Sequence, residues 1–320
     1  MTPPAALQVY EDATRTILAR NDSPDLGFRW SVNPYRGCFH ACSYCYARPS
    51  HEYLGFGAGT DFETKILVKK KAPALLREAF MKGSWKGELV VFSGDTDCYQ
   101  PLEASYQLTR QCLEVCLEFG NPCAVITKSF LIVRDLELLK KLGARTHLSV
   151  TVSIPFSDEK MARLVEPNAA LISKRFEAVK ILAAAGIGAH VNVAPIIPGL
   201  NDSQIPEILK KAKACGAKGA TPVCLRLSGS VKDVFISRLQ KEFPGQAGKI
   251  LSRIREVRQG RLTNSEFGRR HHGEGPYWEN LRRLFDLTCG RLGLNQEASE
   301  EKFQPPFQRP SPQRELELKI

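Results

Sequence analysis

Residues 88–120 read ELVVFSGDTDCYQPLEASYQLTRQCLEVCLEFG, and this stretch contains one complete strand-and-helix unit. Its first part, 88–93, is an apolar run bounded by Gly87 and Gly94, which is the pattern of a buried strand. Its second part, 102–119, carries apolar residues at helical spacing and ends at Gly120, a residue suited to closing a helix. A strand followed by a helix is the repeating unit of folds built on parallel sheets.

The same alternation continues on both sides of this stretch. Further strands are predicted at 30–33, 123–127, 147–153, 187–194 and 220–225, and further helices at 133–142, 173–185, 203–215 and 231–241. Strand and helix alternate about six times, which predicts an α/β fold with a parallel sheet and helical crossovers. Six units fit either a doubly wound open sheet or an incomplete (β/α) barrel, and the pattern alone does not choose between them. In both architectures functional residues gather at the carboxyl ends of the strands.

Composition divides the chain into four segments. We predict an N-terminal arm at 1–25, a core domain at 26–245, a basic helical extension at 246–295 and a disordered tail at 296–320. The extension carries two predicted helices, at 249–259 and 277–292. The tail is rich in Gln, Glu, Pro and Arg and has almost no core residues, so it lacks the apolar content that folding requires.

Composition and charge indicate a soluble protein that binds polyanions. The chain has 320 residues, of which 43% are hydrophobic and 25% charged, as is usual for globular proteins. It has no apolar run long enough to span a membrane and no apolar leader at its start, so a cytoplasmic location is expected. The net charge is +11, and the extension holds ten basic residues against five acidic ones. That excess favours nucleic acid as a partner.

Two accounts of the basic extension are open. If the substrate is nucleic acid, the arginines from Arg253 to Arg283 are predicted to contact phosphate groups outside the barrel. Among them, Arg269 and Arg270 belong to a loop with Gly268 and Gly273, whose backbone can approach a phosphate closely. The alternative is that this loop packs across the mouth of the barrel, where its arginines would pair with acidic residues near Glu63 or Asp97.

Three of the ten cysteines fall within eight residues, in the stretch Cys38-Phe-His-Ala-Cys42-Ser-Tyr-Cys45. Structural zinc sites need four ligands, and four-iron clusters normally also take four cysteines. When only three thiols are supplied to such a cluster, one iron is left open to bind a cofactor or a substrate. The alternative is a zinc-stabilised nucleic-acid-binding module without catalysis, in which His40 or His51 would be the fourth ligand.

The motif C-x3-C-x2-C, with Tyr44 just before the third cysteine, resembles the signature of the radical S-adenosylmethionine enzymes. Other stretches resemble the branch of that superfamily related to spore photoproduct lyase, and together they cover about residues 22–290. These stretches are Asn33–Cys38, Cys45–Arg48, Asp61–Thr64, Ile126–Ser129, Pro195–Asp202, Leu225–Leu227, Gly260–Arg261 and Phe267–Arg269.

The resemblance implies a fold, two cofactors and a type of reaction. The fold is a partial (β/α)6 barrel with a short helical C-terminal extension. A [4Fe-4S] cluster would be bound by Cys38, Cys42 and Cys45, and S-adenosylmethionine would chelate the open iron. An electron from a donor such as a flavodoxin or a ferredoxin would cleave the cofactor to a 5′-deoxyadenosyl radical. That radical would abstract a hydrogen atom from a substrate that the sequence does not identify, with nucleic acid as one possibility; the oligomeric state is not predicted.

Residues that follow the second and third barrel strands are candidate contacts of S-adenosylmethionine. Thr96 and Asp97 resemble a Ser-Asp pair of the lyase, and Asp95 or Asp97 is placed to accept a hydrogen bond from the cofactor's ammonium group. Lys128 ends the third strand, where a cation suits the cofactor's carboxylate. Tyr46 resembles an aromatic cofactor contact, and Tyr44 is a further candidate contact of the cofactor.

Further candidates lie on the fourth and fifth barrel strands. Ser149 and Ser153 share one face of a strand, because side chains alternate along it, and their hydroxyls would suit a ribose or a carboxylate. Asn192 faces either the core or the cofactor.

The remaining cysteines bear on two questions, which are whether the reaction is that of the lyase and whether a second cluster is present. Gly94 stands where the lyase carries its hydrogen-donating cysteine, which indicates a different reaction; Cys98 is a possible substitute donor. Cys112 and Cys116, one helical turn apart with Cys123 behind them, are predicted to be core residues rather than ligands of a second cluster.

Overall fold

Six parallel strands follow one another in chain order across the main sheet of the computed structural model, which describes residues 6–296 and 307–310. A seventh strand, β2, pairs antiparallel with the first of them, so the order is β2-β3-β6-β7-β8-β9-β10. The strands are β2 (Leu18–Arg20), β3 (Trp30–Val32), β6 (Val90–Phe92), β7 (Cys123–Thr127), β8 (Leu148–Ser153), β9 (Ala189–Ile196) and β10 (Gly219–Cys224).

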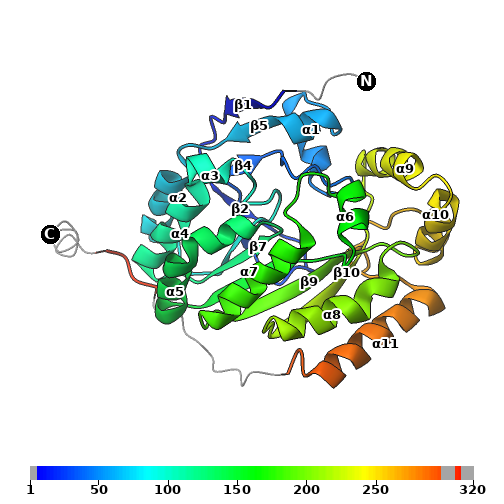
Figure 1. The fold of residues 1–320 in the computed structure, drawn as a ribbon. Coiled ribbons are helices and arrows are strands. Elements are labelled where there is room, and N and C mark those ends of the chain that lie inside the picture. The colour runs from blue at the N-terminus through cyan, green and yellow to red at the C-terminus, as the bar shows by residue number, and fades with distance from the viewer. Residues whose placement is uncertain (1–5, 297–306, 311–320) are drawn as a thin grey trace.

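This strand order decides between the two architectures that the sequence left open. A doubly wound sheet reverses its order at one point and carries helices on both faces. Here the order of the parallel strands never reverses, and right-handed crossovers that all run in one direction place their helices on one face. Figure 1 shows helices α4, α5, α7 and α8 side by side along that face. The fold is therefore a partial (β/α)6 barrel, as predicted, with β2 and β10 as its end strands.

The helices include several that the sequence analysis did not predict. Their bounds are α1 (Thr60–Thr64), α2 (Ala72–Met81), α3 (Glu103–Tyr106), α4 (Leu108–Phe119), α5 (Leu136–Arg145), α6 (Glu159–Val165), α7 (Ile172–Ala184), α8 (Ile205–Ala214), α9 (Val231–Glu242), α10 (Ala247–Glu256) and α11 (Gly275–Leu292). Short 3-10 helices are η1 (Arg48–Leu54), η2 (Phe130–Asp135) and η3 (Asp202–Gln204). The helix predicted at 102–119 is in fact two helices, because Gln107 adopts a left-handed conformation (φ 51°) between them. In the described ranges, no helix is long and apolar enough to cross a membrane.

One row of apolar side chains runs across five neighbouring barrel strands. The register of the sheet aligns Val32, Phe92, Val125, Val150 and Ala189, and none of them has any exposed surface. They belong to the main hydrophobic core together with helix residues such as Leu113 and Leu139. Because side chains alternate along a strand, residues one position along face the inside of the barrel.

A second, smaller sheet adjoins the carboxyl end of β3. Its order is β1 (Gln8–Glu11), β5 (Lys65–Val68) and β4 (Tyr35–Arg36), and Figure 1 shows it beside α1, at one end of the barrel. Two strands of this structure, β1 and β2, lie within the segment predicted as an N-terminal arm. Both pair with strands of the core segment, β1 with β5 and β2 with β3.

The C-terminal extension packs against the last barrel units. Helix α11 contacts α8 and β10, and the Asn295 side chain exchanges hydrogen bonds with the backbone of Ala220. The predicted disordered tail falls mostly outside the described residues. Its described part, 307–310, lies against α4, where the Phe307 ring stacks on Phe119 at 6.1 Å between ring centroids. The division of the chain into an arm, a core, an extension and a tail stays a prediction.

The apolar row predicts a large cost for shortening one of its members. Phe92→Ala removes a fully buried ring, and we expect it to lower the free energy of unfolding by about 3–5 kcal/mol. Tyr53→Ala is the matched control, because that ring is 91% exposed and its loss should change stability by no more than about 0.5 kcal/mol. Urea unfolding followed by circular dichroism measures both. Equal effects of the two changes would contradict the packing described here.

Candidate functional site

The carboxyl ends of the parallel strands bring four polar segments to one edge of the sheet. The three clustered cysteines follow β3 and β4, and Asp95 and Asp97 follow β6. Lys128 follows β7, and Ser153 is the last residue of β8. This edge is where enzymes built on parallel strands place their reactive groups. The rim formed by these loops is therefore the candidate site.

A completely buried arginine fixes the shape of the segment that carries the cysteines, here called the cysteine segment (residues 33–47). Arg48 directly follows it, and its guanidinium donates five hydrogen bonds. The acceptors are the backbone oxygens of Cys42 (2.9 Å), Ala41 (3.2 Å), Ala58 (2.9 Å) and Gly59 (3.0 Å) and the carboxylate of Glu63 (2.5 Å). A planar fork with five donors is matched by no other side chain, so Arg48 fixes the backbone of the cysteine segment at Ala41 and at the second cysteine.

The cysteine segment is also joined to the loop that follows β6 (residues 93–100, the β6 loop). Asp95 N–H donates to Asn33 Oδ1 (2.8 Å), the Thr96 hydroxyl donates to Tyr35 O (2.8 Å), Gln100 Nε2 donates to Gly37 O (3.0 Å), and Phe39 N–H donates to Gln100 Oε1 (3.1 Å). These four hydrogen bonds are spread along both segments. They fix the cysteines relative to the residues that are predicted to bind the cofactor. The two candidate ligand groups are thus held in one rigid unit.

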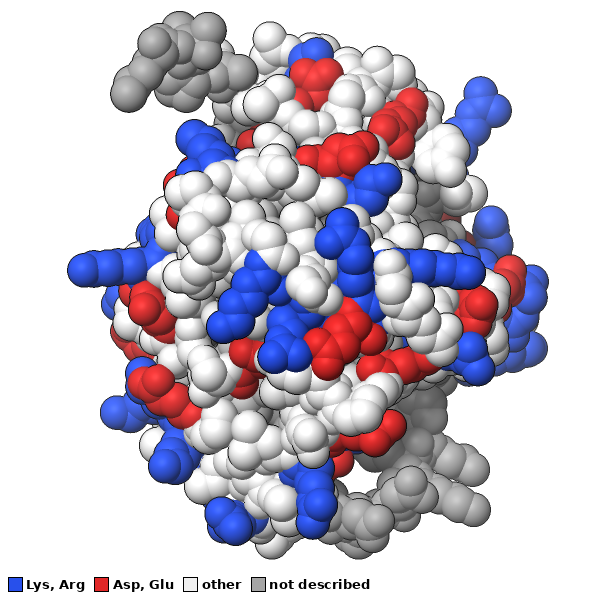
Figure 2. Space-filling model, turned by 90° about the vertical axis from the view of Figure 1, so that its right-hand side faces the viewer, with Lys and Arg blue, Asp and Glu red and all other residues white. Residues whose placement is uncertain are grey.

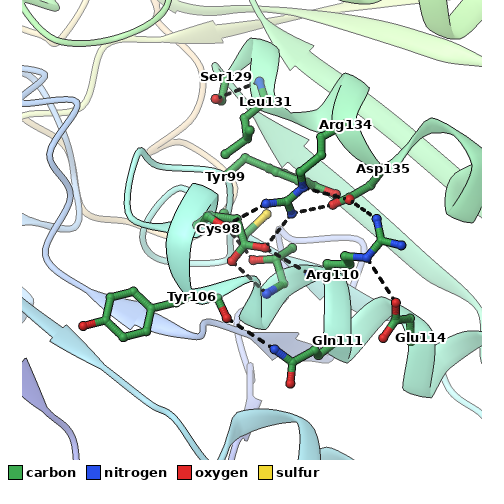
Figure 3. A network of polar contacts seen from close by, with 12 residues as sticks. Cys98, Tyr99, Tyr106, Arg110, Gln111, Glu114, Ser129, Leu131, Arg134 and Asp135 are labelled. Carbon is green, nitrogen blue, oxygen red and sulfur yellow. Dashed lines mark hydrogen bonds and ion pairs between the residues drawn. The ribbon is translucent and has the colours of Figure 1, made fainter.

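A buried network of charged groups supports the β6 loop from behind (Figure 3). The carboxylates of Glu103 and Asp135 have almost no exposed surface, and Arg134 bridges them at 2.9 Å and 2.7 Å. Glu103 also accepts hydrogen bonds from the first backbone N–H groups of α4, those of Thr109 (2.9 Å) and Arg110 (3.1 Å). The Thr109 hydroxyl donates to Cys98 O (2.6 Å). Buried carboxylates satisfied in this way resist movement, so the end of the β6 loop is anchored.

The three thiols of the cysteine segment are free and lie close enough to one another to interact. Cys38 and Cys42 are buried, and Cys45 is partly buried. Burial raises the pKa of all three thiols, and the pKa of Cys38 is raised further by Asp97, Cys45 and Cys42. Bringing three thiolates together in a buried loop is unfavourable unless a positive centre lies between them. A metal centre supplies that charge, because a coordinating thiol loses its proton.

The donor set of the cysteine segment is three free thiols. Within the described ranges, no group of three or more Cys, His, Asp or Glu side chains is placed to hold a single metal ion. In a four-iron cluster each cysteine binds its own iron, so the thiols surround the cluster instead of meeting at a point. Three free cysteines in one rigid loop therefore fit such a cluster.

Lys128 extends over this loop from the end of β7. Its ammonium nitrogen lies 5.7 Å from the centre of the Tyr44 ring, and its charge lowers the pKa of Cys42 and Cys45 against the larger effect of burial. The Tyr44 hydroxyl contacts Glu166, which in turn pairs with the buried Arg175 at 2.5 Å. Lys128 thus carries a positive charge beside two of the three cysteines.

The two aspartates of the β6 loop differ in their surroundings. Both oxygens of Asp97 are occupied by the Thr127 hydroxyl (2.7 Å) and the backbone N–H groups of Tyr99 (2.9 Å) and Lys128 (2.8 Å), while His40 Nδ1 lies 3.4 Å away. Burial alone would raise the pKa of Asp97, but these groups outweigh it and lower that pKa to about 2. Asp97 therefore joins three loops together.

Asp95 has far fewer partners. Among the described residues, only the Ser50 hydroxyl donates to its carboxylate, over 3.3 Å. Burial raises the pKa of Asp95, so its charge is poorly satisfied. Of the two aspartates, Asp95 is the one with room to accept a hydrogen bond from a ligand.

The remaining predicted residues divide by their depth in the barrel. Ser153 and Asn192 pair directly across β8 and β9, near the rim. Ser149 pairs with Ala124 at the other end of β8, roughly 13 Å from Ser153 at 3.3 Å per residue. The structure therefore does not bring Ser149 to the rim. Tyr46 is 49% exposed and donates to Gly94 O (2.9 Å) at the rim itself.

The other cysteines lie in the core. Cys98, Cys112, Cys116 and Cys123 have no exposed surface and pack with apolar side chains, as a core role predicts. Burial raises the pKa of Cys98 and of Cys112.

Both accounts of the loop that carries Arg269 and Arg270 are wrong about Arg270. This side chain is 7% exposed and makes a bidentate ion pair with Asp25 (2.6 and 2.7 Å), rather than facing solvent or pairing near Glu63 or Asp97. Asp25 lies outside the predicted core, in the segment where sequence reasoning expected a loose arm. Arg269 is exposed, with Glu266 at 3.4 Å.

Comparison with known proteins identifies the class. The family model of the radical SAM superfamily matches residues 32–212, which include all three cysteines and the β6 loop. The chain is 38% identical over 234 residues to an uncharacterised protein of Mycobacterium bovis, an alignment that covers 72% of this chain and 68% of that one. It is 22% identical over 266 residues to the radical SAM Nα-GlyT isomerase of Pseudomonas phage M6, covering 82% of this chain and 52% of the isomerase.

The fold is similar to that of spore photoproduct lyase. A structure of a mutant of that lyase with bound AdoMet and dinucleoside spore photoproduct superposes with a TM-score of 0.55 at 17% identity, covering 94% of this chain and 80% of the lyase chain. The family match, the three-cysteine motif and the partial barrel agree, and the chain belongs to the radical SAM superfamily. Its structural neighbours lie in the branch that the sequence analysis named.

Sequence reasoning missed several residues that shape the site. Arg48 lies inside a stretch that resembles the family, so a signal for it was present, but its burial and its partners Ala58, Gly59 and Glu63 depend on a later segment. The Glu166–Arg175 pair carries no motif at all. It becomes visible only once α6 and α7 are packed beside the cysteine segment.

The low pKa of Asp97 predicts an acid sensitivity. A carboxylate whose pKa is lower in the folded protein stabilises the fold above about pH 4, and this contribution is lost as the pH falls toward 2. A shift of roughly two units corresponds to about 2–3 kcal/mol. Because the folded pKa of about 2 lies below pH 2.5, only part of this contribution is lost by then. Between pH 5 and pH 2.5, the unfolding free energy of Asp97→Asn should therefore fall by about 1.5–2 kcal/mol less than the wild type's. If the unfolding free energies of the two proteins fell equally over this pH range, Asp97 would not be the carboxylate responsible for the acid sensitivity.

Proposed function

We propose that this chain is a radical S-adenosylmethionine enzyme whose [4Fe-4S] cluster is held by Cys38, Cys42 and Cys45. When bound and reduced, the cluster supplies one electron that cleaves S-adenosylmethionine to methionine and a 5′-deoxyadenosyl radical, which takes a hydrogen atom from the substrate. The electron comes from a donor such as a flavodoxin or a ferredoxin. The observation that carries this proposal is the rigid loop of three free thiols, on the barrel rim of a chain that belongs to the superfamily.

The rim residues are assigned roles by their chemistry. Lys128 binds the methionyl carboxylate, because its ammonium already lies beside Cys42 and Cys45. Asp95 binds the methionyl ammonium, because its carboxylate is poorly satisfied, whereas Asp97 is occupied in joining loops.

The other predicted residues support the site or line its rim. Thr96 donates its hydroxyl to the Tyr35 backbone and so holds the β6 loop against the cysteine segment. Tyr46, Ser153 and Asn192 line the rim where the ribose and adenine would lie. Tyr44 supports Lys128 from below, and Ser149 has no rim contact to offer.

The proposed substrate is a component of nucleic acid, and the proposed reaction differs from that of the lyase. The solved lyase structure with a dinucleoside and the net charge of +11 support this substrate class. The reaction differs because position 94 cannot carry a thiol. A Cβ built on Gly94 would lie 2.6 Å from Ser31 Cβ, so no cysteine fits there without movement of β3. Cys98, the other candidate donor, is completely buried.

The three cysteines predict a test against matched controls. Single Ala substitutions of Cys38, Cys42 or Cys45 should abolish assembly of the cluster and formation of 5′-deoxyadenosine, because two thiolates cannot hold it. Cys112→Ala is the control, since that thiol lies in the core. Iron content, sulfide content and 5′-deoxyadenosine are measured after anaerobic reconstitution with dithionite. Equal loss of iron from Cys112→Ala would contradict the assignment and indicate a second cluster.

Lys128 predicts a separate effect on the cofactor. Lys128→Ala removes one charge-assisted hydrogen bond, so the dissociation constant of S-adenosylmethionine should rise roughly 10- to 150-fold while iron content stays the same. Lys140→Ala is the control, because that lysine lies on the exposed surface of α5 and pairs with Glu137. Equilibrium binding to the reconstituted protein measures both. An unchanged dissociation constant in Lys128→Ala would place this residue outside the cofactor site.

A further inference from the structure

Three buried nitrogen atoms without a hydrogen-bond partner lie together at the end of the last barrel strand. Of these, His271 Nε2 has an Asp25 carboxylate oxygen at 3.9 Å, and Arg258 interacts with the buried Cys224 thiol. In the described part of the chain, seven buried side-chain polar atoms have no hydrogen-bond partner, and three of these are Arg226 Nε, Arg258 Nε and His271 Nε2. Arg226 follows β10, Arg258 follows α10, and His271 belongs to the loop before α11. Buried donors are nearly always satisfied, so donors left open in one place indicate a ligand.

The charges in this group do not balance. Arg226, Arg258 and Arg270 are here called the arginine cluster. Arg226 interacts electrostatically with the other two, and the carboxylate that acts on it from the described part of the chain is Asp25. Asp25 is already committed to its bidentate pair with Arg270. Arg258 donates from its two terminal nitrogens to four backbone oxygens, those of Leu225, Arg269, Arg270 and His272. One negative charge therefore faces three guanidinium groups and a histidine.

Arg226 is the member of this cluster with no partner. Its side chain makes no hydrogen bond or ion pair with any residue in the ranges 6–296 and 307–310, although it is more than half buried. Burial and the charge of Arg270 lower its pKa, which is the sign of a cation without a counterion. A guanidinium is suited to bind oxyanions, because its planar fork matches two oxygens of a phosphate or carboxylate.

The position of Arg226 connects it to the rim. Arg226 and Tyr46 interact electrostatically, and Tyr46 directly follows the third cluster cysteine. The loop after β10 also approaches the end of the cysteine segment, because a Cβ on Gly229 would lie 3.4 Å from Pro49 Cγ. By contrast, the residues assigned to the cofactor's methionyl group follow β6 and β7, on other strands of the barrel. An anion at Arg226 would therefore lie beside the site, next to the C-terminal extension.

The surface charges in Figure 2 favour a local anion-binding site over a broad basic surface for nucleic acid. On the face that carries α9 and α10, basic and acidic side chains are interspersed. Several arginines of the extension are paired within it, such as Arg253 with Glu256 and Arg282 with Asp286. The basic excess of the extension is therefore partly neutralised on the surface, while the arginine cluster keeps an unbalanced positive charge inside.

We infer that Arg226, with His271 and the backbone-anchored Arg258, forms a subsite that binds a phosphate group of the substrate beside Tyr46. The inference rests on the proposed function for the identity of the substrate, but the subsite itself is testable without turnover. The cofactor's methionyl carboxylate has the same oxyanion chemistry, so the experiment separates these two sources.

The test measures binding of inorganic phosphate and of S-adenosylmethionine, each by isothermal titration calorimetry at fixed ionic strength, to the reconstituted full-length protein. Arg226→Gln should raise the dissociation constant of phosphate about 10-fold or more, the loss expected for one charged hydrogen-bonding group. Arg226→Lys keeps the charge without the fork, so its affinity for phosphate should lie between those of the wild type and Arg226→Gln. Arg255→Gln is the matched control, because that arginine is exposed on α10 in the same extension.

Loss of phosphate affinity in Arg226→Gln, with Arg255→Gln unchanged and S-adenosylmethionine affinity kept, supports the subsite. The inference is overturned if phosphate binds equally to the wild type and Arg226→Gln, or if Arg255→Gln loses as much affinity. It is also overturned if Arg226→Gln loses affinity for S-adenosylmethionine but not for phosphate, because the arginine would then serve the cofactor. A protein that bound phosphate through Arg226 but never cleaved S-adenosylmethionine would refute the proposed function and leave the subsite standing.

Discussion

The buried guanidinium of Arg48 is the interaction on which the geometry of the site depends. It fills the space behind the cysteine segment and satisfies four backbone oxygens that would otherwise be buried without partners. Its charge is balanced by Glu63 at 2.5 Å, and its plane lies against the Phe62 ring at 5.2 Å. The loop from Cys38 to Cys45 is short and contains no helix or strand, so its backbone has few hydrogen bonds of its own to hold its shape. Arg48 supplies from outside the rigidity that three metal-binding thiols require.

The rim is built as one connected unit rather than as separate loops. Gln100 and Thr96 join the β6 loop to the cysteine segment, and Asp97 joins both to the end of β7. Because each loop is fixed by another, a cofactor that contacts Lys128 and Asp95 would be held at a fixed distance from the three thiols. This connection explains how four short segments, which begin in different parts of the chain, can act on one small molecule.

Much of the fold was predictable because its units are local. The pattern of Cys123–Thr127 predicted a strand whose bounds are those of β7, and Gly120 ends α4 as expected. The helix predicted at 133–142 was placed too early, because α5 runs from Leu136 through Gly143 to Arg145. The choice of a barrel was not local, because it depends on which strands pair, and only the order β3-β6-β7-β8-β9-β10 decides it. Helix α2 and the small sheet were missed, since β5 and α2 lie in a stretch that no motif marked.

The site was predictable to the extent that it rests on sequence motifs. The cysteines lie within eight residues of the chain, so their spacing indicated a shared metal centre, and the resemblance to the family implied a cluster with one open iron. The different roles of Asp95 and Asp97 were not predictable, because they depend on hydrogen bonds from Thr127 and Lys128, some 30 residues away. Likewise, Arg270 read as a phosphate ligand until Asp25, from the other end of the chain, was found beside it.

Electron paramagnetic resonance of the reduced protein tests the central claim most directly. The claim is that three cysteines hold a four-iron cluster whose remaining iron is open to S-adenosylmethionine. Anaerobically reconstituted wild-type protein is reduced with dithionite, and its spectrum is recorded with and without the cofactor. The account predicts the signal of a reduced [4Fe-4S] cluster, with g values that change when S-adenosylmethionine is added. A cluster signal that is identical in both samples, or a protein that binds zinc and shows no cluster signal, would contradict it.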